Sequence, residues 1–236
     1  MAPIVYTRDQ LIALRTAGLP HERPDVPQEL RRRRRGTRAG AQRRAWRRRY
    51  RHVLPSIVMG NVRSLPNKMD ELTALTRHQR EYRECSIMLF TETRLNSLTP
   101  DSHVSLGGFN LLRADRTQES GKRKGGGLAV FVNDRWCKPG HITVKEQLCC
   151  KDIELLAVST RPYYLPREFS HVVVIVVYVP PSANGETACD VLHSAVSRLQ
   201  TQHPHALLLI SGDFNHASPS STLPKFTQYV TCHTRQ

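Results

Sequence analysis

The chain has 236 residues, enough for one sizeable domain with a tail, and it carries a formal net charge of +15 at pH 7. Twelve arginines and no acidic residue lie between Arg31 and Arg51, so the basic charge belongs to one segment and the rest of the chain is nearly neutral. The longest apolar stretch, Val172 to Val179, has eight residues, which is too short to cross a bilayer.

The cysteines and the N-terminal residues indicate a protein that is not secreted. The six cysteines include no CxxC pair, and the adjacent Cys149 and Cys150 are poorly placed to begin a disulfide framework, so reduced thiols are expected. No apolar segment of the signal-peptide kind follows Met1. We therefore expect a nuclear or cytoplasmic protein without a membrane partner.

The first 52 residues are predicted to lie outside the folded domain. Residues 1–30 are interpreted as an N-terminal appendage, with a capping box of Thr7 and Gln10 for a short helix before the prolines at 20, 24 and 27. Residues 31–52 form the arginine tract, which self-repulsion and the lack of an apolar face predict to be disordered. Its candidate nucleic-acid-binding residues are Arg31, Arg32, Arg33, Arg34, Arg35, Arg43, Arg44, Arg47, Arg48 and Arg49.

From residue 53 onwards, strand-like and helix-like segments alternate. The expected strands cover about 53–60, 86–91, 128–132, 153–159, 172–179 and 206–210. One helix is expected to begin near Pro66 and to continue on one face as far as Tyr82, and a second to cover about 186–202. Continuous Val/Ile runs between helices predict an α/β domain over 53–236 whose sheets are covered on both faces.

Three of the apolar runs end in polar residues that suit phosphate chemistry. The run Leu207 to Ile210 leads to Gly212-Asp213-Phe214-Asn215, the first strand leads to Asn61, and the second leads to Glu92. Each ending has an ordinary interpretation as well, namely an Asx turn, a turn asparagine or a solvated carboxylate. Because the pattern occurs three times, we expect these polar residues to lie together on one shared rim of the domain. A glutamate this close to a core must be paired or bind a cation.

Two further features have plain structural interpretations. Tyr178 ends the most buried strand, where a core tyrosine is the default. The glycines 125–127 precede a strand rather than a helix, so they are expected to allow close backbone packing and not to bind phosphate. The histidines show no zinc-ligand spacing, and no GxSxG elbow is present.

Taken in chain order, Asn61, Glu92, Tyr178 and the GDFN quartet resemble the endonuclease/exonuclease/phosphatase superfamily. The stretches NVRSLPNKMDEL, TETRL, GGGLAVFV, YVPP and GDFN look like the apurinic-type endonuclease domain of LINE-type, non-LTR retrotransposons. The leader YTRDQLIAL and the arginine tract resemble the start of such element polyproteins. This resemblance implies a DNase I-like fold, a four-layer sandwich of two mixed β-sheets flanked by helices.

The resemblance also implies a reaction and a role for each motif residue. Members of the family cleave phosphodiesters of DNA with magnesium, for which manganese is an alternative. Glu92 would ligate the metal, with Asn61 orienting the metal or the phosphate. Tyr178 would contact the phosphate, Asp213 would activate the attacking water, and Asn215 would hydrogen-bond the developing charge. The implied partners are target DNA and the element's RNA.

Two departures from the family pattern bear on activity. Pro181 stands where the family's nucleases often have Asn, and no Ser-Asp-His triplet follows Asn215. From this we expect a domain that is incomplete at its C-terminus, lacks its last strands and is impaired in catalysis. The alternative is a non-enzymatic nucleic-acid-binding remnant that acts through its arginine tract, which could equally be a localisation signal. A phosphatase of phosphoinositides or small phosphate esters is a third interpretation.

Overall fold

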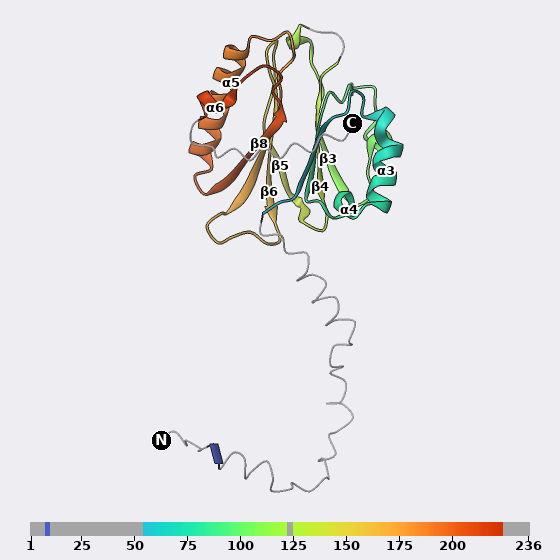
Figure 1. Cartoon of the computed structure of the whole chain (residues 1–236), viewed down its shortest axis with the longest axis vertical. Coiled ribbons are helices and arrows are strands. Elements are labelled where there is room, and N and C mark those ends of the chain that lie inside the picture. Colours follow the sequence, from blue (N-terminus) through green and yellow to red (C-terminus); the bar gives the residue numbers. More distant parts are fainter. Residues whose placement is uncertain (1–7, 10–53, 122–124, 224–236) are drawn as a thin grey trace. The chain divides into compact units, whose positions relative to one another are not determined.

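The computed structural model describes residues 8–9, 54–121 and 125–223 (Figure 1). By its internal contacts the chain divides into two units, Met1–Arg51 and His52–Gln236, and every element considered below belongs to the second. The predictions for residues 1–52 lie outside the described residues, except that Arg8 and Asp9 are helical. No helix within the described ranges is long and apolar enough to span a membrane.

The first sheet is mixed and has four strands in the order β1-β2-β4-β3. Its strands are β1 (Ile57–Asn61), β2 (Ile87–Thr91), β3 (Phe109–Ala114) and β4 (Leu128–Asn133). β1 and β2 run parallel, whereas β4 is antiparallel to both of its neighbours. Every residue of the two central strands is buried, because both faces of the sheet are covered.

The second sheet is also mixed and has the order β5-β6-β7-β8. Its strands are β5 (Cys137–Cys149), β6 (Glu154–Pro162), β7 (His171–Tyr178) and β8 (Ala206–Asp213). β7 and β8 are parallel, and the other two pairs are antiparallel. The valine-rich strand β7 lies in the interior of this sheet and is buried from Val172 to Tyr178.

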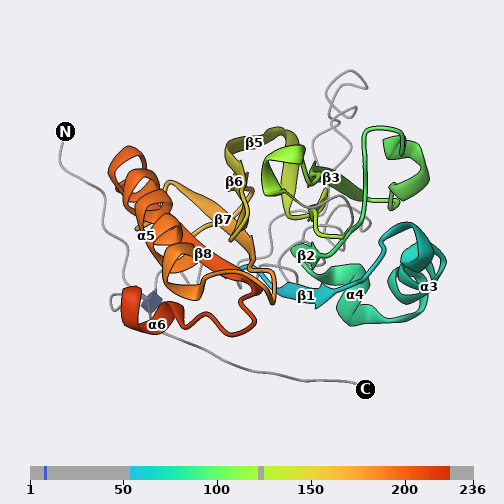
Figure 2. The same cartoon turned by 90° about the horizontal axis from the view of Figure 1, so that it is seen from above.

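Helices cover the outer face of each sheet, so that the domain has four layers (Figures 1 and 2). α3 (Met69–His78) and α4 (Arg80–Glu84) lie on the first sheet, and α5 (Gly185–Gln202) and α6 (Pro219–Thr222) lie on the second. Short 3-10 helices occupy Pro66–Lys68, Asp101–Val104 and Gln118–Ser120. The predicted four-layer sandwich of two mixed sheets is confirmed.

Alternation along the strands produces three apolar layers. Ile87 and Leu89 of β2 pack between the sheets, whereas Met88 and Phe90 face the helix α3. In β7 the residues Val172, Val174 and Val176 likewise face the other sheet, and the alternate residues pack against α5. The layer between the sheets therefore fixes how the two sheets meet.

The first predicted helix is wrong in one respect, since it is interrupted. Gln79 has an extended backbone, with φ −103° and ψ 124°, and separates α3 from α4. Tyr82 still packs against the same apolar cluster as Leu72. The second predicted helix is confirmed, and it begins where the Asn184 side chain accepts hydrogen bonds from the backbone amides of Glu186 and Thr187.

β3 and β5 were not predicted from the sequence. Each is an outermost strand in the strand order described for its sheet. β5 is mostly exposed and includes Pro139 and Gly140, so it lacks an apolar run. The expected boundaries also need correction at two site strands. β8 extends beyond Ile210 to Asp213, and β1 includes Asn61, so these polar residues end strands rather than follow them.

Candidate active site

Polar residues end the strands at the same edge of both sheets. Asn61 is the last residue of β1, and Glu92 directly follows β2. Tyr178 and Asp213 end β7 and β8, where they lie opposite each other in the parallel pairing. Asn61 lies opposite Thr91 in the other parallel pair. Because the paired strands are parallel, their carboxyl ends meet at one edge of each sheet.

Two hydrogen bonds connect these strand ends across the sheets. The Asn61 Nδ2 donates to Asp213 Oδ2 at 3.0 Å, and the Tyr178 hydroxyl donates to Glu92 Oε1 at 3.0 Å. The structure thus brings together these four of the five residues predicted in the sandwich, although Asn61 and Asp213 are 152 positions apart in the chain. We call Asn61, Glu92, Tyr178, Asp213 and the adjacent Asn215 the rim.

Asn215 is held beside Asp213 by its own backbone and side chain. Its backbone amide lies 3.3 Å from Asp213 Oδ1, and its Nδ2 donates to the carbonyl of Val179 at 2.7 Å. The Val179 amide in turn donates to the Asp213 carbonyl at 2.9 Å. Both carboxylate oxygens of Asp213 therefore accept a hydrogen bond within the rim, which fixes the direction of the carboxylate.

Glu92 lies beside the core, and its side chain is 19% exposed. Besides the Tyr178 hydroxyl on Oε1, its Oε2 lies 3.9 Å from a guanidinium nitrogen of Arg94. These two groups provide the pairing that was expected for a carboxylate at this position. Tyr178 is 5% exposed and belongs to the layer between the sheets, so its ring is part of the core while its hydroxyl belongs to the rim.

The Tyr178 hydroxyl stays protonated and acts as a hydrogen-bond donor at neutral pH. Burial raises its pKa to about 12, and the hydrogen bond and negative charge of Glu92 act in the same direction. A phenol with this pKa remains protonated, so Tyr178 can donate a hydrogen bond to a carboxylate or to a phosphate oxygen.

No family model and no curated protein matches the chain. Similar solved structures include humanized D. rerio TDP2, at 12% identity and a TM-score of 0.46, over 72% of this chain and 69% of that one. The human Nocturnin catalytic domain with bound sulfate is 16% identical over 72% of this chain and 68% of that one, with a TM-score of 0.44. The AP endonuclease LMAP from Leishmania major is 16% identical over 66% of this chain and 54% of that one, with a TM-score of 0.47. The interpretation of the rim therefore rests on its own geometry and chemistry.

The rim offers a donor set that suits a hard cation. Mg²⁺ prefers carboxylate and amide oxygens and commonly keeps several waters, so one or two protein ligands are sufficient. Glu92 provides a carboxylate, and the Asn61 amide is oriented by its bond to Asp213 and by the Arg63 amide, which donates to Asn61 Oδ1 at 3.2 Å. Among the described residues no group of three or more His, Cys, Asp or Glu side chains converges to hold a metal ion. The oxygen donors of Glu92 and Asn61 are of the kind that a hard divalent cation accepts.

Glycines 126 and 127 pack closely against neighbouring groups, as the sequence predicted. A Cβ on Gly127 would lie 2.5 Å from Thr93 Oγ1, and one on Gly126 would lie 2.2 Å from the Arg116 guanidinium. Their φ angles of 86° and 69° also favour glycine. Arg116 itself was missed by the sequence interpretation, as was its ion-pair partner Glu154.

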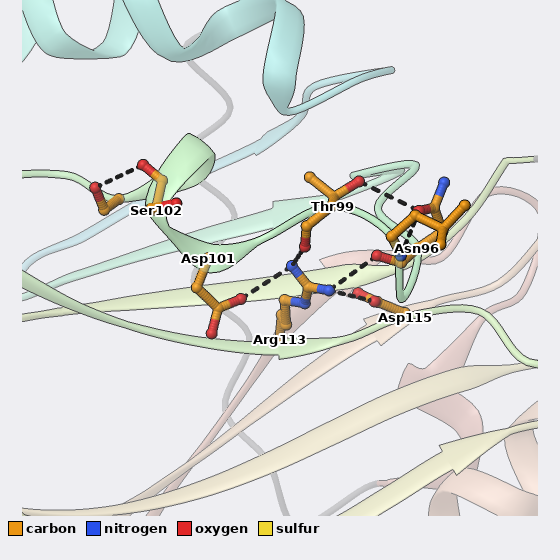
Figure 3. A network of polar contacts seen from close by, with 8 residues as sticks. Asn96, Thr99, Asp101, Ser102, Arg113 and Asp115 are labelled. Atoms are coloured by element: carbon orange, nitrogen blue, oxygen red, sulfur yellow. Dashed lines mark hydrogen bonds and ion pairs between the residues drawn. The ribbon is translucent and has the colours of Figure 1, made fainter.

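A second polar network anchors the segment from Asn96 to Asp101 (Figure 3). Arg113 donates to the carbonyls of Thr99 and Asn96 at 2.8 and 3.0 Å, and it forms ion pairs with Asp101 and Asp115, each at 2.9 Å. Burial raises the pKa of Asp115, against the opposing effect of Arg113. Because Arg113 lies on β3, which the sequence did not predict, no sequence pattern indicated this anchor.

The backbone is unusual around the rim. Among the described residues, four that are not glycine have positive φ angles: Arg63 at 52°, Glu92 at 52°, Arg94 at 55° and Asn215 at 47°. Two of these belong to the rim, and the other two are close to Asn61 and Glu92 in the chain. Left-handed conformations of non-glycine residues persist where the surrounding structure enforces them.

Proposed function

We propose that the rim is the catalytic centre of a magnesium-dependent, phosphodiester-cleaving DNA endonuclease domain of LINE-type retrotransposon origin. The observation that carries this proposal is the pair of cross-sheet hydrogen bonds, Asn61 to Asp213 and Tyr178 to Glu92. They bring together the four motif residues that resemble the family, at the carboxyl ends of parallel strands. The retrotransposon origin is supported by the sequence stretches around those residues.

Each rim residue has a role that suits its contacts. Glu92 and Asn61 would hold the metal, which supplies Lewis-acid charge to the phosphate when it is bound. Asp213, oriented by Asn61 and by the Asn215 amide, would accept a proton from the attacking water. When a phosphate binds, the Tyr178 hydroxyl would redirect its single hydrogen bond from Glu92 Oε1 to a phosphate oxygen, and Asn215 would stabilise the developing charge.

No Ser-Asp-His triplet occurs between Asn215 and Gln236, so within these residues the rim would carry the stabilisation of the transition-state charge. A missing group of this kind commonly reduces the rate by about 10² to 10³. We therefore expect slow nicking of DNA rather than rapid turnover.

The test is nicking of supercoiled plasmid by the 236-residue chain with Mg²⁺, beside reactions with EDTA. Substitution Glu92→Gln removes the metal-binding charge and keeps the shape, so we expect at least about a 100-fold loss of nicking. Glu71→Gln is the matched control, because Glu71 is an exposed carboxylate on α3 that pairs only locally with Lys68. Nicking that survives EDTA or Glu92→Gln unchanged would contradict the proposal.

A second candidate function is non-enzymatic nucleic-acid binding. The observation that favours it is the arginine tract, in which twelve arginines occur without an acidic residue. A folded sample that binds DNA but shows no metal-dependent nicking would favour this function over catalysis.

A further inference from the structure

A buried ion pair lies next to the rim and has no role in the reaction described above. The side chains of Arg116 and Glu154 are only 8% and 3% exposed, and they form a salt bridge. Glu154 lies opposite Tyr178 in the pairing of β6 with β7, and the Arg116 guanidinium carbon lies 5.8 Å from the centre of the Tyr178 ring. Because a buried ion pair contributes little net stability, stability alone does not explain why this pair is present.

The ion pair also holds the glycine segment behind Glu92. The second carboxylate oxygen of Glu154 accepts a hydrogen bond from the Gly127 amide at 2.6 Å. Arg116 occupies the space that a side chain on Gly126 would need. One carboxylate and one guanidinium thus fix the position of two consecutive peptide groups.

The glycine segment in turn binds the residues that follow Glu92. The amide of Thr93 donates to the Gly127 carbonyl at 3.2 Å, and the amide of Arg94 donates to the Gly126 carbonyl at 2.8 Å. These bonds hold the chain directly after Glu92, whose own φ of 52° is a conformation that requires support.

Contacts therefore hold both the side chain and the backbone at Glu92. The side chain is held by Tyr178, whose aromatic ring lies under the Arg116 guanidinium. The backbone is held through Gly126 and Gly127, which contact Arg116 and Glu154. Among the contacts described, only the ion pair touches both Tyr178 and the glycine segment.

We propose that Arg116 and Glu154 are positioning residues that fix both the backbone and the side-chain partner of Glu92. This inference rests on the proposed function of the rim, in which Glu92 binds the metal. Residues that orient a metal ligand typically change metal affinity by about 10- to 100-fold when they are altered. The ion pair thus acts on Glu92 through Tyr178 and the glycine segment.

The test uses two conservative variants of the 236-residue chain. Glu154→Gln keeps the shape but loses the charge, and Arg116→Lys keeps the charge but loses the planar fork. We expect amide hydrogen exchange at Thr93 and Arg94 to accelerate at least about tenfold, as measured by NMR. We expect Mn²⁺ affinity, measured by electron paramagnetic resonance, to fall by about tenfold or more, and kcat for nicking to fall more than KM changes.

The matched control is Arg113→Lys, because Arg113 is also largely buried and paired but anchors the Asn96–Thr99 turn instead. This variant should leave exchange at Thr93 and Arg94 unchanged. Wild-type exchange and Mn²⁺ affinity in both ion-pair variants, with the β7 amides still protected, would overturn the inference. If one of the two variants unfolds, the other alone decides the inference by the same exchange and Mn²⁺ measurements, because each removes a different half of the ion pair.

The exchange measurement separates this inference from the proposed function. Nicking that is insensitive to Glu92→Gln would contradict the catalytic role of the rim, whatever the ion pair does. Unchanged exchange at Thr93 and Arg94 would contradict the positioning role, even if nicking requires Glu92.

Discussion

Histidines 171 and 203 form a pair at the end of the second sheet opposite the rim, since His171 begins β7 whereas Tyr178 ends it. Their rings are T-shaped, with centroids 4.9 Å apart, and the Ser170 hydroxyl lies 2.7 Å from His171 Nδ1. Burial lowers the pKa of both histidines, and nearby Lys145 acts in the same direction. For His171 the charges of His203 and Arg161 add to this effect.

The sign of the pH dependence follows from these directions. The histidines of the unfolded chain bind protons near pH 6.5, whereas in the folded chain they do so only at lower pH, so the folded protein loses stability as the pH falls below about 6.5. We expect the midpoint of thermal unfolding to be lower at pH 5.5 than at pH 7.5. The double substitution His171→Gln and His203→Gln should reduce that difference.

The control for this experiment is His78→Gln, which removes an exposed histidine on α3 far along the chain from the pair. A double variant that keeps the full wild-type difference between the two pH values would show that this pair does not cause it.

Individual site residues could be predicted from the sequence where a long apolar run preceded them. Glu92 and Asp213 follow such runs, and the structure places both at strand ends. The Arg116–Glu154 pair could not be predicted in this way. Its members are 38 positions apart, and they lie in a loop and at the start of a strand, so no periodicity relates them.

At the scale of elements, the central strands were predictable, as were β1 and β8, whereas β3 and β5 were not. β2 and β7 are covered on both faces and therefore consist of continuous apolar residues. β5 has a largely exposed surface and a polar composition, so only its pairing with β6 makes it a strand. The break at Gln79 was missed for a related reason, because Tyr82 keeps the apolar spacing across it.

Two glycines at the ends of site strands have opposite surroundings. A Cβ on Gly212 in β8 would lie 1.9 Å from the Val177 carbonyl oxygen, whereas one on Gly60 in β1 would meet no atom within 4 Å. Gly212→Ala would force β8 away from β7 just before Asp213. We expect it to lower the free energy of unfolding by about 1 to 3 kcal/mol.

Gly60→Ala is the matched control, because Gly60 stands immediately before Asn61 as Gly212 stands before Asp213. We expect it to change the free energy of unfolding by no more than about 1 kcal/mol, and in the stabilising direction. Urea denaturation measures both values. Equal losses in the two variants would show that the close approach to Val177 is not the cause.

At the scale of the whole molecule, the excess positive charge and the described sandwich occupy different parts of the sequence. The arginine tract carries the excess positive charge, while the sandwich from residue 54 onwards provides the rim and three apolar layers. Nucleic-acid affinity and chemistry would therefore depend on different parts of the chain.

This separation predicts how DNA binding depends on salt. If six to ten arginines of the tract contact phosphates, affinity should fall by about 10³ to 10⁵ between 50 and 200 mM salt. Deletion of residues 31–52 should weaken binding and flatten this dependence, as measured by fluorescence anisotropy on a labelled duplex. Glu92→Gln, which leaves the tract intact, should bind with wild-type affinity. Binding that is unchanged by the deletion would place the DNA contacts elsewhere.

The four left-handed residues around the rim also have a consequence for how such a sequence changes over generations. A glycine at Arg63, Glu92, Arg94 or Asn215 would relieve a conformational cost of about 1 kcal/mol or more at each position, but it would remove the side chain. Related sequences that no longer need the site would gain stability from glycine at these positions, without any change in their core. Counting glycines at these four positions would then distinguish related sequences under selection for the site from those that merely fold.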